Sequence, residues 1–209
     1  MYIPPAFRED RQEVLHDLIR QHSFGTLVSY DAGELVASHL PFLLDSERGP
    51  CGTLLGHMAR ANPQWRSLTN DADVLVLFQG PHAYISPAWY QTELSVPTWN
   101  YVAIHAYGCP RLVQGEGALR SILEATVRTY EGGYEQPWRM ERLPDDFLAK
   151  LMEAIVGFEI PISRLEGKLK LSQNRPPADR QGVVANLRRQ DDPLGRAVAD
   201  LMASLNERG

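Results

Sequence analysis

The chain has 209 residues, enough for one domain with a sizeable core or for a core domain with a helical appendage. Its formal net charge of −5 lacks the basic surplus with which proteins usually neutralise DNA phosphates, so we do not expect direct DNA binding. No apolar stretch approaches the roughly 20 residues of a membrane helix, and the start MYIPPAFRED does not resemble a signal peptide. We therefore expect a cytoplasmic protein without a membrane segment.

Residue types that bind metals or form disulfides are sparse. The two cysteines, Cys51 and Cys109, are too far apart for a disulfide framework or a zinc site. The six histidines show neither HExxH nor HxH spacing, so we expect no metal site. The GxGxxG and GxxxxGK[ST] phosphate loops and the GxSxG nucleophile motif do not occur, and the sequence identifies no catalytic residue.

Strand patterns dominate the first half of the chain. An apolar helical stripe at Arg8–His22 comes first, and alternating and β-branched residues then predict strands. The predicted strands are Thr26–Tyr30, Glu34–Leu44, Thr53–His57, Asp73–Gln79 (extended by Ala83–Ser86 beyond a kink at Gly80–Pro81) and Thr98–Tyr107. Asp31–Gly33 suits a tight hairpin loop, and Pro41 marks an edge or a bend.

Helical patterns gather in the second half. Apolar spacing predicts helices at Leu119–Tyr130, Asp145–Val156, Ala178–Arg189 and Pro193–Asn206. Short strands are expected at Leu112–Gly115 and at Phe158–Ile162, with Leu165–Leu171 prolonging the latter. Because no βαβ alternation occurs, we predict a mainly β protein, a small antiparallel barrel with peripheral helices. Residues 1–175 would form the barrel domain, with an N-terminal helix and inserted helices, and residues 176–209 a C-terminal helical extension packing on the barrel.

A first polar tract follows the third predicted strand. His57, Arg60 and Asn62 lead into a helix that starts at Pro63. An arginine beside exposed helical N–H groups suits an anion, because the guanidinium and the helix dipole both favour a phosphate. The alternative is that Asn62 only caps the helix and Arg60 is solvated.

A second tract, VPTWNYVAIHAYG, spans Val96–Gly108. Thr98, Trp99 and Asn100 combine a hydroxyl, an indole and an amide at the start of a strand. A flat heteroaromatic ligand needs such a combination of an apolar face with fixed donors and acceptors. Equally, the aromatic residues belong to the core or to an interface, and the amide satisfies a neighbouring backbone group.

A third tract, EGKLKLSQNR, spans Glu166–Arg175. Lys168, Lys170 and Arg175 form a local basic cluster among hydroxyl and amide side chains. One interpretation is that the tract binds a phosphate or a carboxylate. The other is a solvated strand end that leads into the loop at Pro176.

Taken together, five tracts resemble those of the PaiB-like family, whose members are described as FMN-binding negative transcriptional regulators. In chain order these are HLPF (His39–Phe42), GHMARANPQW (Gly56–Trp65), VLVLFQGPHAYISPAWY (Val74–Tyr90), VPTWNYVAIHAYG and EGKLKLSQNR. The resemblance covers the chain to about Gln190. It implies the FMN-binding split β-barrel fold, shared with pyridoxamine phosphate oxidases and flavin reductases. It also implies a homodimer that binds FMN in the groove between its subunits.

The resemblance places the flavin contacts at particular positions. The implied cofactor-binding residues are Ser38, His39 and Leu40 on the second strand, then His57, Met58, Arg60 and Asn62, then Thr98, Trp99 and Asn100, and finally Lys170 and Gln173. The oxidases carry a basic residue at each end of the second strand. Here Ser38 and Leu43 stand at those places, a difference that weakens the expected hold on the phosphate.

The implied function is that of a flavin-binding regulator. Since we find no helix-turn-helix with a basic recognition helix, we expect regulation through metabolites or a protein partner. An alternative is a flavin reductase or another flavin-dependent oxidoreductase, in which the flavin carries out the hydride or electron transfer. A third hypothesis is a barrel that binds haem or another small ligand through His39 or His57.

Overall fold

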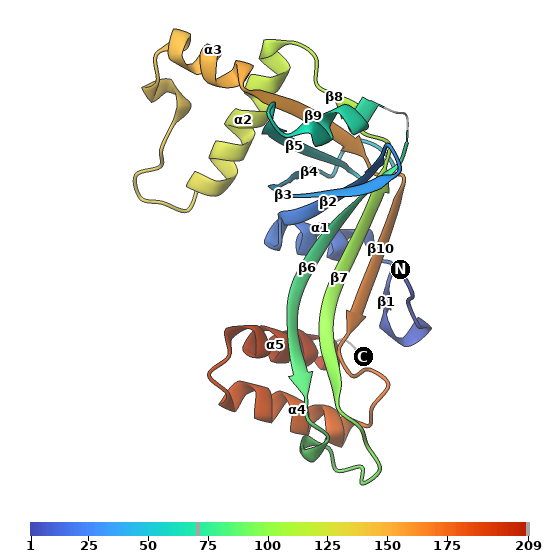
Figure 1. Cartoon of the computed structure of the whole chain (residues 1–209). Helices are drawn as coiled ribbons and strands as arrows, with labels where there is room; N and C mark the ends of the chain where they lie inside the picture. The colour runs from blue at the N-terminus through green and yellow to red at the C-terminus, as the bar shows by residue number, and fades with distance from the viewer. Residues whose placement is uncertain (70–71, 208–209) are drawn as a thin grey trace. The chain divides into compact units, whose positions relative to one another are not determined.

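The computed structural model describes residues 1–69 and 72–207, which form antiparallel sheets with helices (Figure 1). Two compact units divide the chain. Unit 1 comprises Met1–Leu18, Gln79–Ile104 and Glu166–Gly209, and unit 2 comprises Ile19–Phe78 and His105–Leu165. The elements that contribute residues to both units are α1 (Gln12–Gln21), β6 (Val74–Ile85), β7 (Thr98–Gly108) and β10 (Arg164–Lys170).

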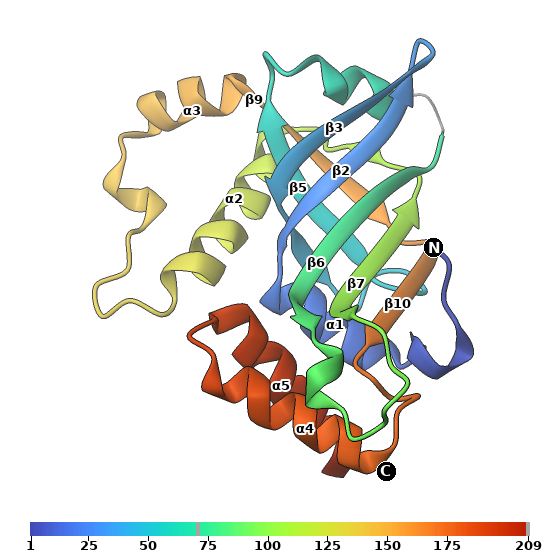
Figure 2. The same cartoon turned by 60° about the horizontal axis from the view of Figure 1, so that its bottom comes forward.

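The hairpin of β2 (Phe24–Asp31) and β3 (Glu34–Pro41) gives unit 2 its first sheet, in the order β6-β2-β3 (Figure 2). Its tight turn places Ala32 and Gly33 at φ of 48° and 92°, the left-handed region that a type I′ turn requires. Strand β2 pairs with β3 along its whole length and also with β6, where Thr26 lies opposite Leu77. The expected hairpin loop is therefore confirmed.

A second sheet in unit 2 has the order β4-β5-β9-β8. Its strands are β4 (Leu43–Asp45), β5 (Thr53–Ala59), β9 (Ile155–Pro161) and β8 (Arg111–Leu112). The core contains Phe42, whose ring meets those of Phe78 and Phe158 edge-on at centroid distances of 5.7 and 6.2 Å. All three side chains are fully buried.

The segment between β8 and β9 forms the helical insert of unit 2. It contains α2 (Glu116–Glu131), the 3-10 turn η4 (Met140–Arg142) and α3 (Asp145–Glu153). Met140, Leu148 and Met152 make a small core of their own, against which α2 packs partly buried leucine and valine side chains. The insert thus carries apolar packing apart from the aromatic core of the sheets.

In unit 1, neighbouring strands are hydrogen-bonded in the order β1-β10-β7-β6. Strand β1 (Arg8–Glu9) follows the turn η1 (Pro5–Phe7) and pairs with β10, Arg8 lying opposite Lys168. The helices α4 (Pro177–Arg189) and α5 (Pro193–Glu207) pack on each other, and η3 (Pro87–Trp89) contacts α4. None of the helices that the structure describes is long and apolar enough to cross a membrane.

Several predicted boundaries were wrong for identifiable reasons. The first helix begins at Gln12 rather than Arg8, because the preceding residues pair with β10. The strand expected over Glu34–Leu44 breaks after Pro41, which has no N–H for the ladder. Leu165–Leu171 does not prolong β9, since β9 ends at Pro161 and β10 pairs elsewhere.

Two further differences concern strand β6 and the segment after Asn62. Gly80–Pro81 does not interrupt β6, which runs from Val74 to Ile85 as one strand. The helix predicted at Pro63 is the 3-10 helix η2 (Pro63–Thr69). The four later helices are confirmed, although α3 ends at Glu153 because Ile155 already pairs with Ala59 in β9. The domain boundary expected at residue 175 stays a prediction.

The aromatic core predicts a large effect of Phe158→Ala on stability. Loss of a fully buried ring and of its edge contact with Phe42 should lower the free energy of unfolding by about 3–5 kcal/mol. The matched variant Phe147→Ala, on a side chain 49% exposed, should cost less than about 1 kcal/mol. Urea unfolding followed by circular dichroism measures both, and equal losses would contradict this account of the core.

Candidate functional site

Asn62 joins the start of η2 to strand β3. Its side-chain oxygen accepts a hydrogen bond from the backbone N–H of Gln64 at 3.0 Å, which confirms the predicted cap. Its amide nitrogen donates to Ser38 Oγ at 2.8 Å. Asn62 and Ser38, two of the predicted site residues, are therefore brought together, and the bond between them holds η2 against β3.

Gln64 completes this polar contact and was missed by sequence reasoning. Its buried Nε2 donates to the carbonyl oxygens of Leu27 and Val36 and to Ser29 Oγ, at 3.1 to 3.2 Å. Its Oε1 is buried without a partner in the part of the chain that the structure describes. A glutamine next to an Asn-Pro cap carries no sequence signal for a buried role, because its partners are main-chain groups of distant strands.

Arg60 faces main-chain carbonyl groups. Its Nε donates to the carbonyl oxygen of Glu153 at 2.7 Å and its Nη2 to that of Ile155 at 2.9 Å. Its backbone N–H donates to the carbonyl oxygen of Ala154 at 2.8 Å. The exposed guanidinium thus satisfies carbonyls at the C-terminal end of α3, where a positive charge is also favoured by the helix dipole.

His39 lies on the outer face of the β2–β3 hairpin, and Leu40 is half-buried beside it. The imidazole is exposed and stacks on the ring of Phe24, with centroids 6.5 Å apart. Tyr30 and Leu35, opposite each other on the two strands, are 65% and 76% exposed. The hairpin therefore presents an aromatic and apolar surface around His39.

His57 and Met58 point to different environments on β5. Met58 is buried, 2% exposed, and belongs to the core. His57 is half-buried opposite Gly157 of β9, and burial lowers the pKa of its imidazole below the ordinary value of 6.5. The side chain is consequently neutral at pH 7 and is available as a hydrogen-bonding group rather than as a cation.

In unit 1, Lys170 contacts two other predicted site residues, Thr98 and Trp99. Its ammonium group donates to Thr98 Oγ1 and to the carbonyl oxygen of Trp99, which joins the end of β10 to the start of β7. Burial, followed by the positive charges of Lys168 and Arg175, lowers the pKa of Lys170. The structure thus brings Thr98, Trp99 and Lys170 together.

Asn100 and Gln173 have mainly internal partners. Asn100 is 1% exposed, and its amide donates to Ser172 Oγ at 2.9 Å and to Met202 Sδ at 3.4 Å. Gln173 accepts a hydrogen bond from the backbone N–H of Leu171 at 2.7 Å and donates to the carbonyl oxygen of Leu169. Asn100 is therefore a buried residue, as the structural alternative expects, but its partners are side chains rather than the backbone group that this alternative names.

Trp99 opens onto a pocket of about 590 Å³. The indole is 53% exposed, with the rings of His82 and Tyr84 at centroid distances of 6.3 and 6.0 Å, and Trp89 also lines the pocket. Sequence reasoning missed these aromatic neighbours. The signal was present in the tract Val74–Tyr90, where they stand close together.

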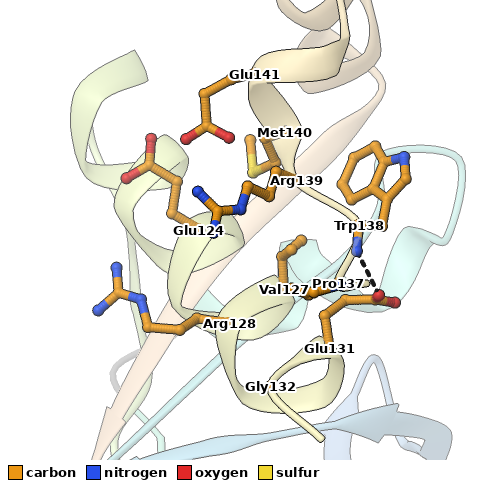
Figure 3. Close-up of a pocket in the computed structure, with 10 residues that line it drawn as sticks. All are labelled: Glu124, Val127, Arg128, Glu131, Gly132, Pro137, Trp138, Arg139, Met140 and Glu141. Atoms are coloured by element: carbon orange, nitrogen blue, oxygen red, sulfur yellow. Dashed lines mark hydrogen bonds between the residues drawn. The ribbon is translucent and has the colours of Figure 1, made fainter. Parts of the chain in front are cut away.

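Another pocket, of about 310 Å³, lies on the helical insert between α2 and the loop that follows it (Figure 3). Val127 and Trp138 line it together with glutamates and arginines, and the backbone N–H of Trp138 donates to Glu131 at 2.8 Å. It contains none of the predicted site residues. Among the described residues, no group of three or more His, Cys, Asp or Glu side chains is placed to hold a metal ion.

Comparison with known families shows to which family this chain belongs. Residues 1–164 match the family described as "Putative FMN-binding domain". The chain belongs to this family. Protease synthase and sporulation protein PAI 2 of Bacillus subtilis is 38% identical over 202 residues, which are 97% of this chain and 96% of that protein. The PaiB-like resemblance of the sequence tracts is thereby confirmed.

A fungal protein is also similar to this chain. An uncharacterized protein of Emericella nidulans is 32% identical over 246 residues, covering 99% of this chain and 98% of that protein. Among solved structures, the flavocytochrome Anf3 from Azotobacter vinelandii has a TM-score of 0.61 at 15% identity, over 78% of this chain and 69% of that one. The FAD and heme binding protein from Mycobacterium smegmatis scores 0.58 at 17% identity, over 78% and 73%. At such identities these two likenesses concern the fold alone.

The half-buried imidazole of His57 predicts that the stability of the protein depends on pH. The folded protein binds the His57 proton more weakly than the unfolded chain, so the free energy of unfolding should fall as the pH is lowered through 6.5. An NMR titration should give a His57 pKa below 6.5, and His57→Gln should flatten the dependence of stability on pH between about 7 and 5. A measured pKa at or above 6.5 would contradict the burial argument.

Proposed function

We propose that this protein binds FMN and acts as a flavin-dependent regulator. The observation that carries the proposal is membership of the FMN-binding-domain family, supported by 38% identity to PAI 2 over nearly the full length of both chains. The PaiB-like resemblance of the sequence tracts supports the regulatory role. A net charge of −5 favours regulation through a metabolite or a protein partner over direct contact with DNA.

The residues of unit 1 fit a flavin ring. A flat heteroaromatic ring needs an apolar surface and fixed polar groups at its edge. Trp99, His82 and Tyr84 provide the rings, and Ser86, Gln190 and Asp192 are the polar residues of the same lining. The pocket volume of about 590 Å³ lies within the range of roughly 300–1,000 Å³ that is usual for small-molecule sites.

The polar residues of unit 2 are proposed as a separate set of flavin contacts. Ser38 and His57 offer a hydroxyl and a neutral imidazole, and His39 is exposed on the hairpin. These groups would bind and orient the ligand. Bound FMN supplies hydride or electron transfer chemistry, so its redox state is the signal that such a regulator reads.

The proposed functional form is a homodimer. The outer face of the β2–β3 hairpin exposes Phe24, Tyr30 and Leu35, each by more than 60%. Clustered exposed aromatic and aliphatic side chains mark protein interfaces, because burial of their surface drives association. The split-barrel resemblance implies a homodimer, and we propose that a second copy of the chain covers this face.

The absorption spectrum of the purified protein tests flavin binding. FMN added to the protein should give flavin absorption that survives desalting, and Trp99→Ala should weaken FMN binding by roughly tenfold, or about 1.4 kcal/mol. Trp138→Ala, in the pocket of the helical insert, is the matched control and should leave the affinity unchanged. Complete loss of flavin absorption from the wild-type protein on desalting would count against FMN as its cofactor.

Sedimentation equilibrium tests the dimer. Leu35→Glu places a charge on the proposed interface and should convert the dimer to a monomer at micromolar concentration, since an unpaired charge is costly to bury. Leu94→Glu, at a leucine 95% exposed outside that face, should leave the protein dimeric. A monomeric wild type, or a Leu35→Glu variant that stays dimeric, would show that this face is not the interface.

A further inference from the structure

A second cavity of unit 1, of about 190 Å³, lies where the end of β10 meets the start of β7. Tyr90, Thr98, Lys170, Ser172 and Arg175 line it, so its wall combines two cations with three hydroxyl groups. Such a wall differs from that of the neighbouring aromatic pocket around Trp99. The composition points to a negatively charged ligand group.

Positive charge in this cavity is not balanced by an adjacent carboxylate. Within residues 1–69 and 72–207, no carboxylate forms an ion pair with Lys170 or Arg175. Asp179 attracts Arg175 from a greater distance, but its carboxylate accepts hydrogen bonds from the backbone N–H groups of Gln91 and Thr92 and from Thr92 Oγ1. Lys168 adds a third cation to the tract, and burial, followed by the positive charges of Lys168 and Arg175, lowers the pKa of Lys170.

The donors in the cavity retain capacity for a ligand. An ammonium group has three donors, and Lys170 uses two of them on Thr98 Oγ1 and the Trp99 carbonyl. The Arg175 guanidinium lies 4.5 Å from the ring centroid of Tyr90 and donates to Ser95 Oγ at 3.3 Å, which fixes its plane while leaving most of its five donors. The side chains are thus positioned before any ligand arrives.

Two local features indicate that the cavity is more than a gap in packing. The hydroxyl of Tyr90 is buried and has no hydrogen-bond partner among the described residues, which is costly unless a ligand or water meets it. Ser172 is buried with a φ of 63°, a conformation that non-glycine residues adopt rarely. Backbone strain of this kind concentrates at ligand sites.

We propose that this cavity is an oxyanion site, in which Lys170 and Arg175 bind the phosphate or carboxylate group of a small molecule. A cavity of about 190 Å³ admits such a group but not a whole flavin nucleotide, which needs a larger pocket. The oxyanion has two sources, the phosphate of FMN itself or a separate small acid, and the first of these rests on the proposed function. Arg60, the other predicted phosphate ligand, already donates to two carbonyl oxygens.

Titration of the full-length protein with inorganic phosphate, at ionic strength held constant with chloride, tests the site. Phosphate should bind the wild type and raise its melting temperature, whereas Lys170→Gln and Arg175→Gln should weaken phosphate binding at least tenfold. Lys170→Arg should restore part of the affinity, and Lys150→Gln, at an exposed lysine of α3, is the matched control that should bind as the wild type does. Tyr90→Phe keeps the aromatic ring next to Arg175 and should weaken phosphate binding more modestly. This variant still tests the site if Lys170→Gln does not fold.

Riboflavin and FMN distinguish the two sources. If the oxyanion is the FMN phosphate, phosphate competes with FMN, and Lys170→Gln weakens FMN binding while leaving riboflavin affinity unchanged. If it belongs to a separate acid, phosphate and FMN bind independently, and Lys170→Gln loses phosphate binding only. Phosphate binding without any flavin binding would leave the oxyanion site in place and overturn the proposed function. The site would be overturned if the wild type does not bind phosphate and binds FMN and riboflavin equally. It would also be overturned if the Lys170→Gln and Arg175→Gln variants bind phosphate as the wild type does.

Discussion

The edge-to-face contacts among Phe42, Phe78 and Phe158 are the constraint on which unit 2 depends. A β-carbon built on Gly25 would lie 2.9 Å from the ring of Phe78, and one built on Gly56 would lie 2.9 Å from that of Phe158. Glycine at these two positions therefore lets the rings reach the strands. The position of β5, and with it that of His57, follows from this packing.

Many features of the fold could be predicted because they are local. The hairpin turn at Ala32 and Gly33, strands with alternating burial such as β7, and the amphipathic helices all leave a pattern within a few residues. What could not be predicted depends on distant pairing. Arg8 continues a helical pattern but pairs with Lys168 in a strand, because a partner far along the chain outweighs local propensity.

In the candidate site, too, the sequence indicates which residue types are present but not which partners they bind. The sequence pattern indicates polar residues inside or next to strands as site candidates. In the structure, several of them form hydrogen bonds with backbone groups. Asn62 caps η2, Arg60 donates to carbonyls near the end of α3, and Gln173 closes the end of β10 on itself. A sequence pattern cannot separate these roles from ligand binding, since both need a donor or acceptor at a strand end.

The cations of the third tract differ from Arg60 in what surrounds them. Arg60 donates to carbonyl oxygens that carry partial negative charge, and these contacts account for its position without a ligand. Lys170 and Arg175 instead lie near a third cation and a buried hydroxyl, an arrangement that costs free energy in the folded protein. Because folded proteins retain such costs mainly where function needs them, the more informative basic residues of this chain are those that form no ion pair among the described residues.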